Sequence, residues 1–319
     1  MARRRVSCHG LTRGGVGIGS LFCGKGPVPL PRGRKGNPIM RTIQAKDVTR
    51  AVAQMCIKAN CTLQDDVVSC LECARHEEPW PVAQATLDTI LENVRIAKTD
   101  NVPLCQDTGM ACVFVELGED VRIEGGSLRA AIDEGVRRGY TDGYLRKSMV
   151  ADPLRRENTK DNTPALVTFD VVSGDSLKIV LAPKGAGSEN MGMLKMLKPA
   201  DGVEGVKDFV LEAVRHAGPN PCPPIVVGVG IGGNFDHVAS LAKRALVRPL
   251  SQPNPDPFYA ALEGELLDAI NAFGTGPAGF GGKTTALAVH IEQMPTHIAC
   301  LPVAVNINCH VARHEEVVL

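Results

Sequence analysis

The sequence has few aromatic residues and no long apolar run. One of its 319 residues is Trp, three are Tyr and eight are Phe, so a hydrophobic core must be built mostly from Val, Ala, Leu and Ile. No apolar stretch approaches the roughly 18 residues of a membrane-spanning helix, and we expect no membrane association. The 33 glycines and 22 prolines predict many tight turns.

The first 39 residues lack acidic side chains altogether. They contain eight Lys or Arg residues, are rich in Gly and Pro, and have no helical or strand periodicity. The absence of an apolar segment after the arginines argues against a secretory signal. A targeting peptide, an anion-binding arm, a disordered tail or a start codon placed upstream of Met40 would each explain this composition. We expect a basic, disordered leader over residues 1–40 and one catalytic domain over residues 41–319.

The remaining residues are acidic, with 27 Lys or Arg against 35 Asp or Glu. They also lack the basic, aromatic-rich stretches that are typical of nucleic-acid-binding proteins. We therefore expect no nucleic-acid partner.

The cysteine count is odd, which argues against a framework of disulfides. Without a secretory signal it favours a reducing compartment, and we expect a cytoplasmic protein. Cysteines there serve as small buried residues, nucleophiles or metal ligands. The eleven are Cys8, Cys23, Cys56, Cys61, Cys70, Cys73, Cys105, Cys112, Cys222, Cys300 and Cys309.

Helical periodicity dominates residues 42–98, and strand patterns become common after residue 110. Further helices are expected over 127–139, 206–218, 236–247 and 256–274, and apolar strands over 110–118, 165–183, 221–233, 284–295 and 297–312. The segment 165–183 has a turn at Ser173–Asp175 and is typical of a hairpin. The pattern predicts an α/β fold, in which an N-terminal helical region is followed by a mixed β-sheet packed by helices.

Three single cysteines each lie where a strand is expected to begin or end. Cys105 opens CQDTG, Cys222 lies in NPCPP and Cys309 follows VAVNIN. Cys105, Gln106 and Asp107 place a thiol, an amide and a carboxylate at one loop, which suits a metal ligand, a hydrogen-bond donor and a proton carrier. Three thiolates would suit an iron–sulfur cluster with one iron free of protein ligands, whereas such distant cysteines are a weak zinc signal. Ordinary turns with buried cysteines also explain the segments, and the sequence does not show that they converge.

Two other segments are candidates for ligand contact. In KGAGSEN, residues 184–190, glycines allow backbone amides to approach a small dicarboxylate, although a solvated turn also fits. His297 is expected at a strand edge near the Cys309 segment, where a structural histidine is the default. The pair Cys70 and Cys73 fits two ordinary positions of a helix, and the glycine runs at 228–233 and 281–284 match no nucleotide-binding motif.

Taken together, these segments resemble the α subunit of class I iron–sulfur fumarate hydratases, in the two-subunit form. The matching motifs occur in order over about residues 42–319. They are PLCQDTGM, YLRKS, KGAGSEN, LKPADG, NPCPP with VGVGIGG, GGKTTALAVH, PTHIA and PVAVNINCH.

The resemblance implies a [4Fe-4S] cluster and a set of site residues. Cys105, Cys222 and Cys309 correspond to the cluster ligands, and the open iron would act on malate as a Lewis acid. Asp107 and His297 correspond to catalytic residues. Substrate-binding residues of the family correspond to Gln106, Arg146 and Gly187, with Arg146 suited to bidentate contact with a carboxylate.

The implied reaction is the reversible hydration of fumarate to S-malate, a step of the tricarboxylic acid cycle. Tartrate dehydratase, a sibling enzyme on the same scaffold, is one alternative, although residues 187–190 retain the fumarase-like GSEN. A non-catalytic protein that binds a cluster or zinc is another. Single-chain members of the family carry a further C-terminal domain. Because this chain ends at Leu319, we expect a separate β subunit to complete the active site, in an α2β2 assembly or with an α–α dimer.

Overall fold

The computed structural model describes residues 40–319, which belong to one compact unit. The expectations for the basic leader concern residues 1–39 and lie outside this range. None of the helices in the described part is long and apolar enough to cross a membrane.

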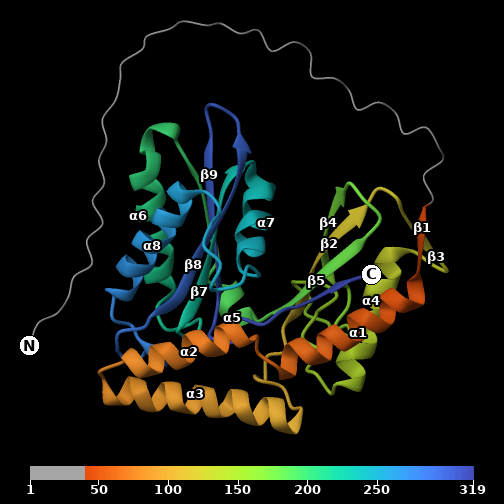
Figure 1. Ribbon diagram of the computed structural model, residues 1–319, viewed down its shortest axis with the longest axis horizontal. Coiled ribbons are helices and arrows are strands. Elements are labelled where there is room, and N and C mark those ends of the chain that lie inside the picture. The colour runs from red at the N-terminus through yellow and green to blue at the C-terminus, as the bar shows by residue number, and fades with distance from the viewer. Residues whose placement is uncertain (1–39) are drawn as a thin grey trace, which may run out of the picture. The chain divides into compact units, whose positions relative to one another are not determined.

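The N-terminal helical region that the sequence predicts is present (Figure 1). It contains α1 (Ala45–Cys61), α2 (Asp65–Glu77) and α3 (Pro81–Asp100), preceded by the short strand β1 (Arg41–Gln44). Pro81 occupies the first turn of α3, where its missing N–H costs no hydrogen bond. Asn101 ends that helix in a left-handed conformation, with φ of 52°. Strand β1 pairs in parallel with β3 (Val121–Glu124).

The first four-stranded sheet has the order β10-β5-β2-β4. Its strands are β2 (Met110–Gly118), β4 (Leu166–Val172), β5 (Leu177–Lys184) and β10 (Glu315–Val318). Helices α1 and α4 (Leu128–Asp142) pack on it, and Val52, Ile132 and Val115 are fully buried between them. Strand β4 runs parallel to β2, whereas β5 is antiparallel to it.

The hairpin expected over residues 165–183 is wrong, although both of its strands exist. Strand β2 lies between β4 and β5 and pairs with each of them. The turn that joins β4 and β5 crosses the end of β2, where the amide of Gly118 donates to the carbonyl of Ser176. Residues Ala111–Val115 are buried, so this apolar strand gains more from the central position than β4, whose residues are mostly exposed.

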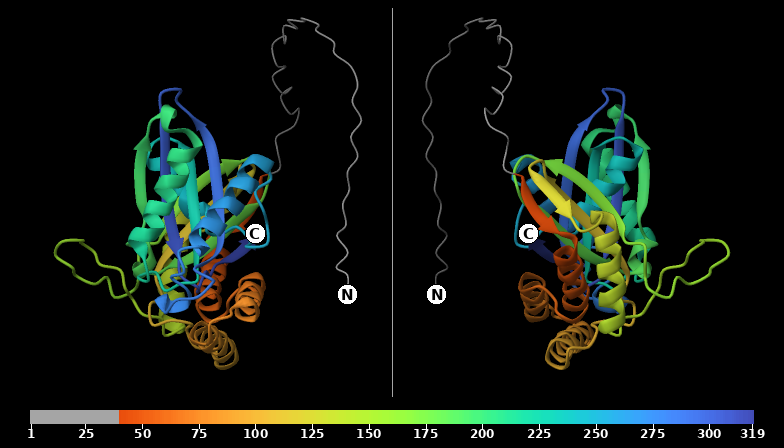
Figure 2. Two further views of the ribbon diagram at one scale, coloured as in Figure 1. Left: turned by 90° about the vertical axis from the view of Figure 1, so that its left-hand side faces the viewer. Right: turned by 90° about the vertical axis from the view of Figure 1, so that its right-hand side faces the viewer.

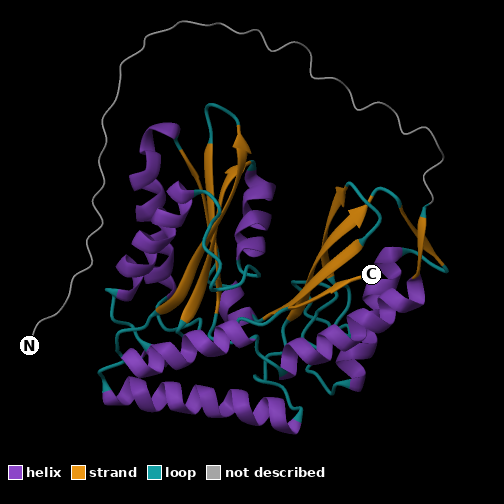
Figure 3. Cartoon of the chain, in the orientation of Figure 1, coloured by secondary structure: helices purple, strands orange, loops and turns teal. Residues whose placement is uncertain are grey.

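The second four-stranded sheet has the order β6-β9-β7-β8. Its strands are β6 (Met193–Leu197), β7 (Ile225–Gly233), β8 (Ala286–Thr296) and β9 (Leu301–Asn308). Helices α6 (Gly202–Ala217) and α8 (Pro257–Asn271) cover one face, and α7 (Phe235–Ala245) covers the other (Figure 3). The short helix α5 (Ala186–Glu189) follows β5, and 3-10 turns occur at Pro199–Asp201 and Pro277–Gly279. The predicted α/β class is confirmed, with the strands divided between two main sheets and the two-stranded β1–β3 sheet.

Glycines of β7 allow α7 to lie directly on the strand. A Cβ atom at Gly230 would come within 2.2 Å of the Val238 carbonyl oxygen, and one at Gly228 within 2.2 Å of the Ala242 carbonyl oxygen. These two glycines therefore set the distance between helix and sheet.

We expect Gly230→Ala to lower the free energy of unfolding by about 2–3 kcal/mol, because the added methyl group would overlap helix backbone that cannot rotate away. Gly264→Ala is the matched control, since Gly264 lies in α8 with open space around it. That variant should gain about 0.5–1 kcal/mol from higher helix propensity. Urea unfolding measures both, and equal stabilities of the two variants would contradict the packing argument.

Candidate active site

The pairing of the strands brings the three candidate cysteines to one place. Strand β7 begins opposite the end of β9, with Val226 paired to Asn308. Cys222, which precedes β7, and Cys309, which follows β9, therefore lie at the same end of the second sheet. In the first sheet Met110 pairs with Lys184, so the Cys105 loop before β2 lies beside the glycine turn after β5.

The two ends meet around a cavity of about 220 Å³. All three cysteines line it, together with Gln106 and Gly187. Burial and the neighbouring Cys105 thiol both raise the pKa of Cys222. Burial also raises the pKa of Cys309, although the guanidinium of Arg313 acts in the opposite direction. The remaining lining residues are Asp107, Pro183, Gly185, Ser188, Asn220, Pro221, Asn308, Val311 and Arg313.

Cys222 has a constrained backbone. Its φ of 54° lies in the left-handed region, and its amide donates to the Pro219 carbonyl at 3.0 Å. Its carbonyl accepts from the amide of His310 at 3.4 Å and lies 3.0 Å from the His310 Nδ1. Burial lowers the pKa of His310, and since a carbonyl only accepts, the neutral ring must donate from Nδ1. His310 thus ties the Cys222 loop to the Cys309 segment, a role that its position after Cys309 did not reveal.

Asp107 is held at the cavity by backbone amides. Its Oδ1 accepts from the amide of Gly109 at 3.0 Å and its Oδ2 from the amide of Ala186 at 2.8 Å. Its own amide donates to the Cys105 sulfur at 3.4 Å. A Cβ at Gly185 would come 3.2 Å from Oδ2, so glycine leaves room for the carboxylate. The Cys105 loop and the glycine turn are therefore joined through Asp107.

Arg146 and His297 do not line this cavity. Arg146 lies at the base of the loop between α4 and β4, which extends away from the sheets (Figure 2), and its carbonyl accepts from the Thr108 hydroxyl at 2.8 Å. His297 lies in the turn between β8 and β9, so the eight residues of β9 separate it from Cys309, or about 25 Å of extended strand. The expectation that His297 lies near the Cys309 segment is wrong within one chain. His297 precedes β9 and Cys309 follows it, so the two residues lie at opposite ends of this strand.

A partly buried ionic network joins the glycine turn to α7 and β9. Lys184 donates to the Ser188 hydroxyl at 2.8 Å and lies 3.5 Å from the Glu189 carboxylate. Glu189 also accepts from Lys243 of α7 at 2.5 Å and from Asn306 of β9 at 3.1 Å. Burial lowers the pKa of Lys184 to about 8, against the attraction of Glu189. Burial would raise the pKa of Glu189, but the two lysines and Asn306 outweigh it and lower that pKa.

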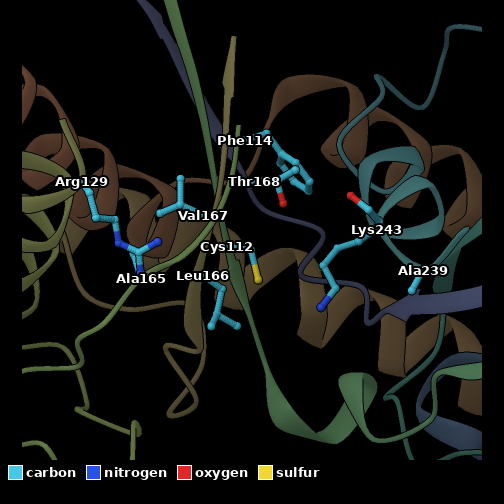
Figure 4. Close-up of a pocket in the computed structure, with 10 residues that line it drawn as sticks. Cys112, Phe114, Arg129, Ala165, Leu166, Val167, Thr168, Ala239 and Lys243 are labelled. Atoms are coloured by element: carbon cyan, nitrogen blue, oxygen red, sulfur yellow. Dashed lines mark hydrogen bonds between the residues drawn. The ribbon is translucent and has the colours of Figure 1, made fainter. Parts of the chain in front are cut away.

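A larger cavity, of about 430 Å³, lies between the first sheet and α7 (Figure 4). Its cations are already paired, since Lys243 binds Glu189 and Arg129 contacts Asp133 and the Ala165 carbonyl. Cys112 is its only cysteine among the described residues, and burial raises the pKa of that thiol. The smaller cavity, which gathers three thiols and a carboxylate, is the better candidate for chemistry.

The smaller cavity gathers three thiols, the ligand type that iron–sulfur clusters take. Within residues 40–319, no group of three or more His, Cys, Asp or Glu side chains could hold one metal ion. A cluster differs because each thiolate binds a different iron, so the sulfurs need not meet at one atom. In addition, Arg313 lines the cavity, and its buried Nε and Nη1 have no partner, so the lining includes a cation with unused donors.

A family model and individual relatives both match most of the chain. The family model described as fumarate hydratase (Fumerase) matches residues 49–318. The chain is 44% identical over 268 residues to the putative L(+)-tartrate dehydratase subunit alpha of Methanocaldococcus jannaschii, covering 82% of this chain and 94% of that protein. It is 33% identical over 266 residues to the L(+)-tartrate dehydratase subunit alpha of Escherichia coli strain UTI89, covering 82% of this chain and 87% of that one.

We expect Glu189→Ala to lower the free energy of unfolding by about 2–4 kcal/mol, because Lys184 would remain buried without its carboxylate. Glu92→Ala is the control: Glu92 pairs with Arg95 on the exposed surface of α3, and its loss should leave the urea midpoint unchanged. A Glu189→Ala variant as stable as the control would show that the network adds nothing.

Proposed function

Since the chain belongs to the fumarate hydratase family, we propose that it is the α subunit of an iron–sulfur hydro-lyase that interconverts fumarate and S-malate. The family match confirms the family that the sequence motifs indicated. The observation that carries the proposal is the convergence of Cys105, Cys222 and Cys309 with Asp107 on one cavity.

The three cysteines would hold a [4Fe-4S] cluster. When bound, its iron without a protein ligand would supply Lewis-acid polarisation of a substrate oxygen. The chain's contribution is to fix the thiols by different means: the Asp107 amide donates to the Cys105 sulfur, His310 anchors the backbone of Cys222, and strand β9 places Cys309.

Asp107 is the proton carrier that this chain offers. Hydration of an alkene places a hydroxyl on one carbon and a proton on the next, so a group in the cavity must exchange that proton. Each carboxylate oxygen of Asp107 accepts one backbone amide and keeps a second lone pair. The same amides orient the carboxylate before substrate enters.

Gln106 and Gly187 are suited to bind a dicarboxylate. Both line the cavity beside Asp107, and an amide N–H or a backbone N–H can donate to a carboxylate oxygen. Arg146 and His297 keep their proposed roles in substrate binding and catalysis, although neither is among the residues that line the cavity.

A separate β subunit completes the site in this proposal. The relatives are named as alpha subunits, and among the described residues Arg313 is the only cationic side chain that lines the cavity, whereas a dicarboxylate has two charges to pair. We propose an α2β2 assembly or an α–α dimer with β subunits.

We also propose a cytoplasmic location: all nine cysteines of residues 40–319 are free thiols, as is usual in a reducing compartment.

Tartrate is the second candidate substrate, because the relatives just described carry the name tartrate dehydratase. L-tartrate differs from malate by one added hydroxyl group, so both dicarboxylates need the same anchoring of two carboxylates. An active site that has a polar partner for the added hydroxyl would prefer tartrate, since a buried partner left unpaired is costly.

The substrate is tested by producing the chain anaerobically with the β subunit of the same organism and measuring initial rates on fumarate, S-malate and both enantiomers of tartrate. We expect fumarate and S-malate to have the highest kcat/KM, and the reconstituted chain without the β subunit to show no turnover. Faster dehydration of L-tartrate would establish the second candidate. Full-rate turnover by the single chain would contradict the need for a partner.

Cluster binding is tested separately with cysteine variants. Cys105→Ser, Cys222→Ser and Cys309→Ser should each lose most of the iron, sulfide and visible absorbance after anaerobic reconstitution. Cys300→Ser is the control, because Cys300 lies in the β8–β9 turn away from the cavity. Retention of the full cluster by any of the three variants would remove that cysteine from the ligand set.

A further inference from the structure

Arg313 is a buried cation with unused hydrogen-bond donors. It lies four residues after Cys309, lines the cysteine cavity and is 5% exposed. Its Nη2 donates to the backbone carbonyl of Asp107. Its Nε and Nη1 are buried and have no partner, and no carboxylate of residues 40–319 forms an ion pair with it.

This arrangement is unfavourable unless an anion is present. The guanidinium remains charged at every accessible pH, and burying an unpaired charge or donor costs free energy. The groups that feel its charge are Cys309, Cys61 and Tyr140. Of these only Cys309 lines the cavity, so the unpartnered donors belong to a side chain that lines the same cavity as the three thiols.

We propose that Arg313 is a positioning residue for the group that the cysteines hold: it fixes the Cys105–Asp107 loop through the Asp107 carbonyl and donates from its unpartnered Nε and Nη1 to thiolate or sulfide sulfur. The inference rests on the proposed cluster. Hydrogen bonds to sulfur and a nearby positive charge stabilise an anionic cluster and raise its reduction potential. Arg313 thereby links the Cys105 loop and the Cys309 segment to the negative charge of the cluster that these cysteines hold.

Depth in the cavity assigns Arg313 to the cluster rather than to a substrate carboxylate. Gln106 and Cys222 are exposed, so a dicarboxylate would enter on their side. Arg313 is almost completely covered, and it contacts the backbone of the Asp107 loop rather than the open mouth.

The experiment compares Arg313→Met, Arg313→Lys and Arg248→Met with the unmodified chain in complex with its β subunit. Arg248 is the matched control, because it is also buried and has an unpartnered Nε, but binds Glu263 and Glu292 away from the cavity. The measurements are iron loss to a chelator under anaerobic conditions, the reduction potential, and Tm with and without the cluster.

For Arg313→Met we expect iron to be lost about 10-fold faster, as fits the 10- to 100-fold effects of removing an outer-shell partner of a metal site. The reduction potential should fall, and the rise in Tm on cluster loading should shrink. Arg313→Lys should be intermediate, since it keeps the charge but not the planar set of donors. Arg248→Met should lower Tm of both forms alike and leave the loading effect unchanged.

Two results would overturn the proposal while leaving the cluster in place. One is Arg313→Met with unchanged iron retention, potential and loading effect, which would make Arg313 a structural residue only. The other is a 10-fold rise in KM with all three cluster properties unchanged, which would assign the side chain to substrate. If the unmodified complex binds no iron, the proposed function itself fails, and the inference fails with it.

Discussion

The partly buried carboxylate of Glu189 makes the interactions on which the site depends. It contacts Lys184 of the first sheet, Lys243 of helix α7 and Asn306 of the second sheet. Helix α5, which carries Glu189, therefore cannot shift without taking the carboxylate away from Lys184, which is almost completely buried. Because the amide of Ala186 in the same helix holds Asp107, a network whose charged groups do not line the cavity helps to determine where the Asp107 carboxylate lies.

The sequence predicts the parts of this structure better than their pairing. Helical periodicity, apolar strands and the three loops that carry Cys105, Cys222 and Cys309 are all local features, and each is found where the sequence places it. The incorrect hairpin and the misplaced His297 share another cause. Which strands pair, and at which end of a strand a residue lies, depend on contacts between distant segments, and β2 intervenes between β4 and β5 for reasons of burial.

The residues that sequence reasoning missed are those that act through other residues. His310 and Arg313 follow Cys309 closely, yet their partners are the backbone of Cys222 and Asp107, 88 and 206 residues away. Lys184 and Glu189 flank the glycine turn that was identified, but a lysine and a glutamate five positions apart are usually a solvated pair. Only the burial of Lys184, at 3% exposure, shows otherwise.

The Glu189 network and Arg313 differ in whether the chain alone supplies partners for their charges. The lysines around Glu189 share a carboxylate within the chain, so the charges of that network are paired before any ligand binds. Arg313 has one backbone acceptor and two unused donors, so its pairing is completed only by an anion in the cavity. A group that binds the folded chain and not the unfolded one stabilises it. The stability of this region is therefore coupled to occupation of the cysteine cavity through Arg313.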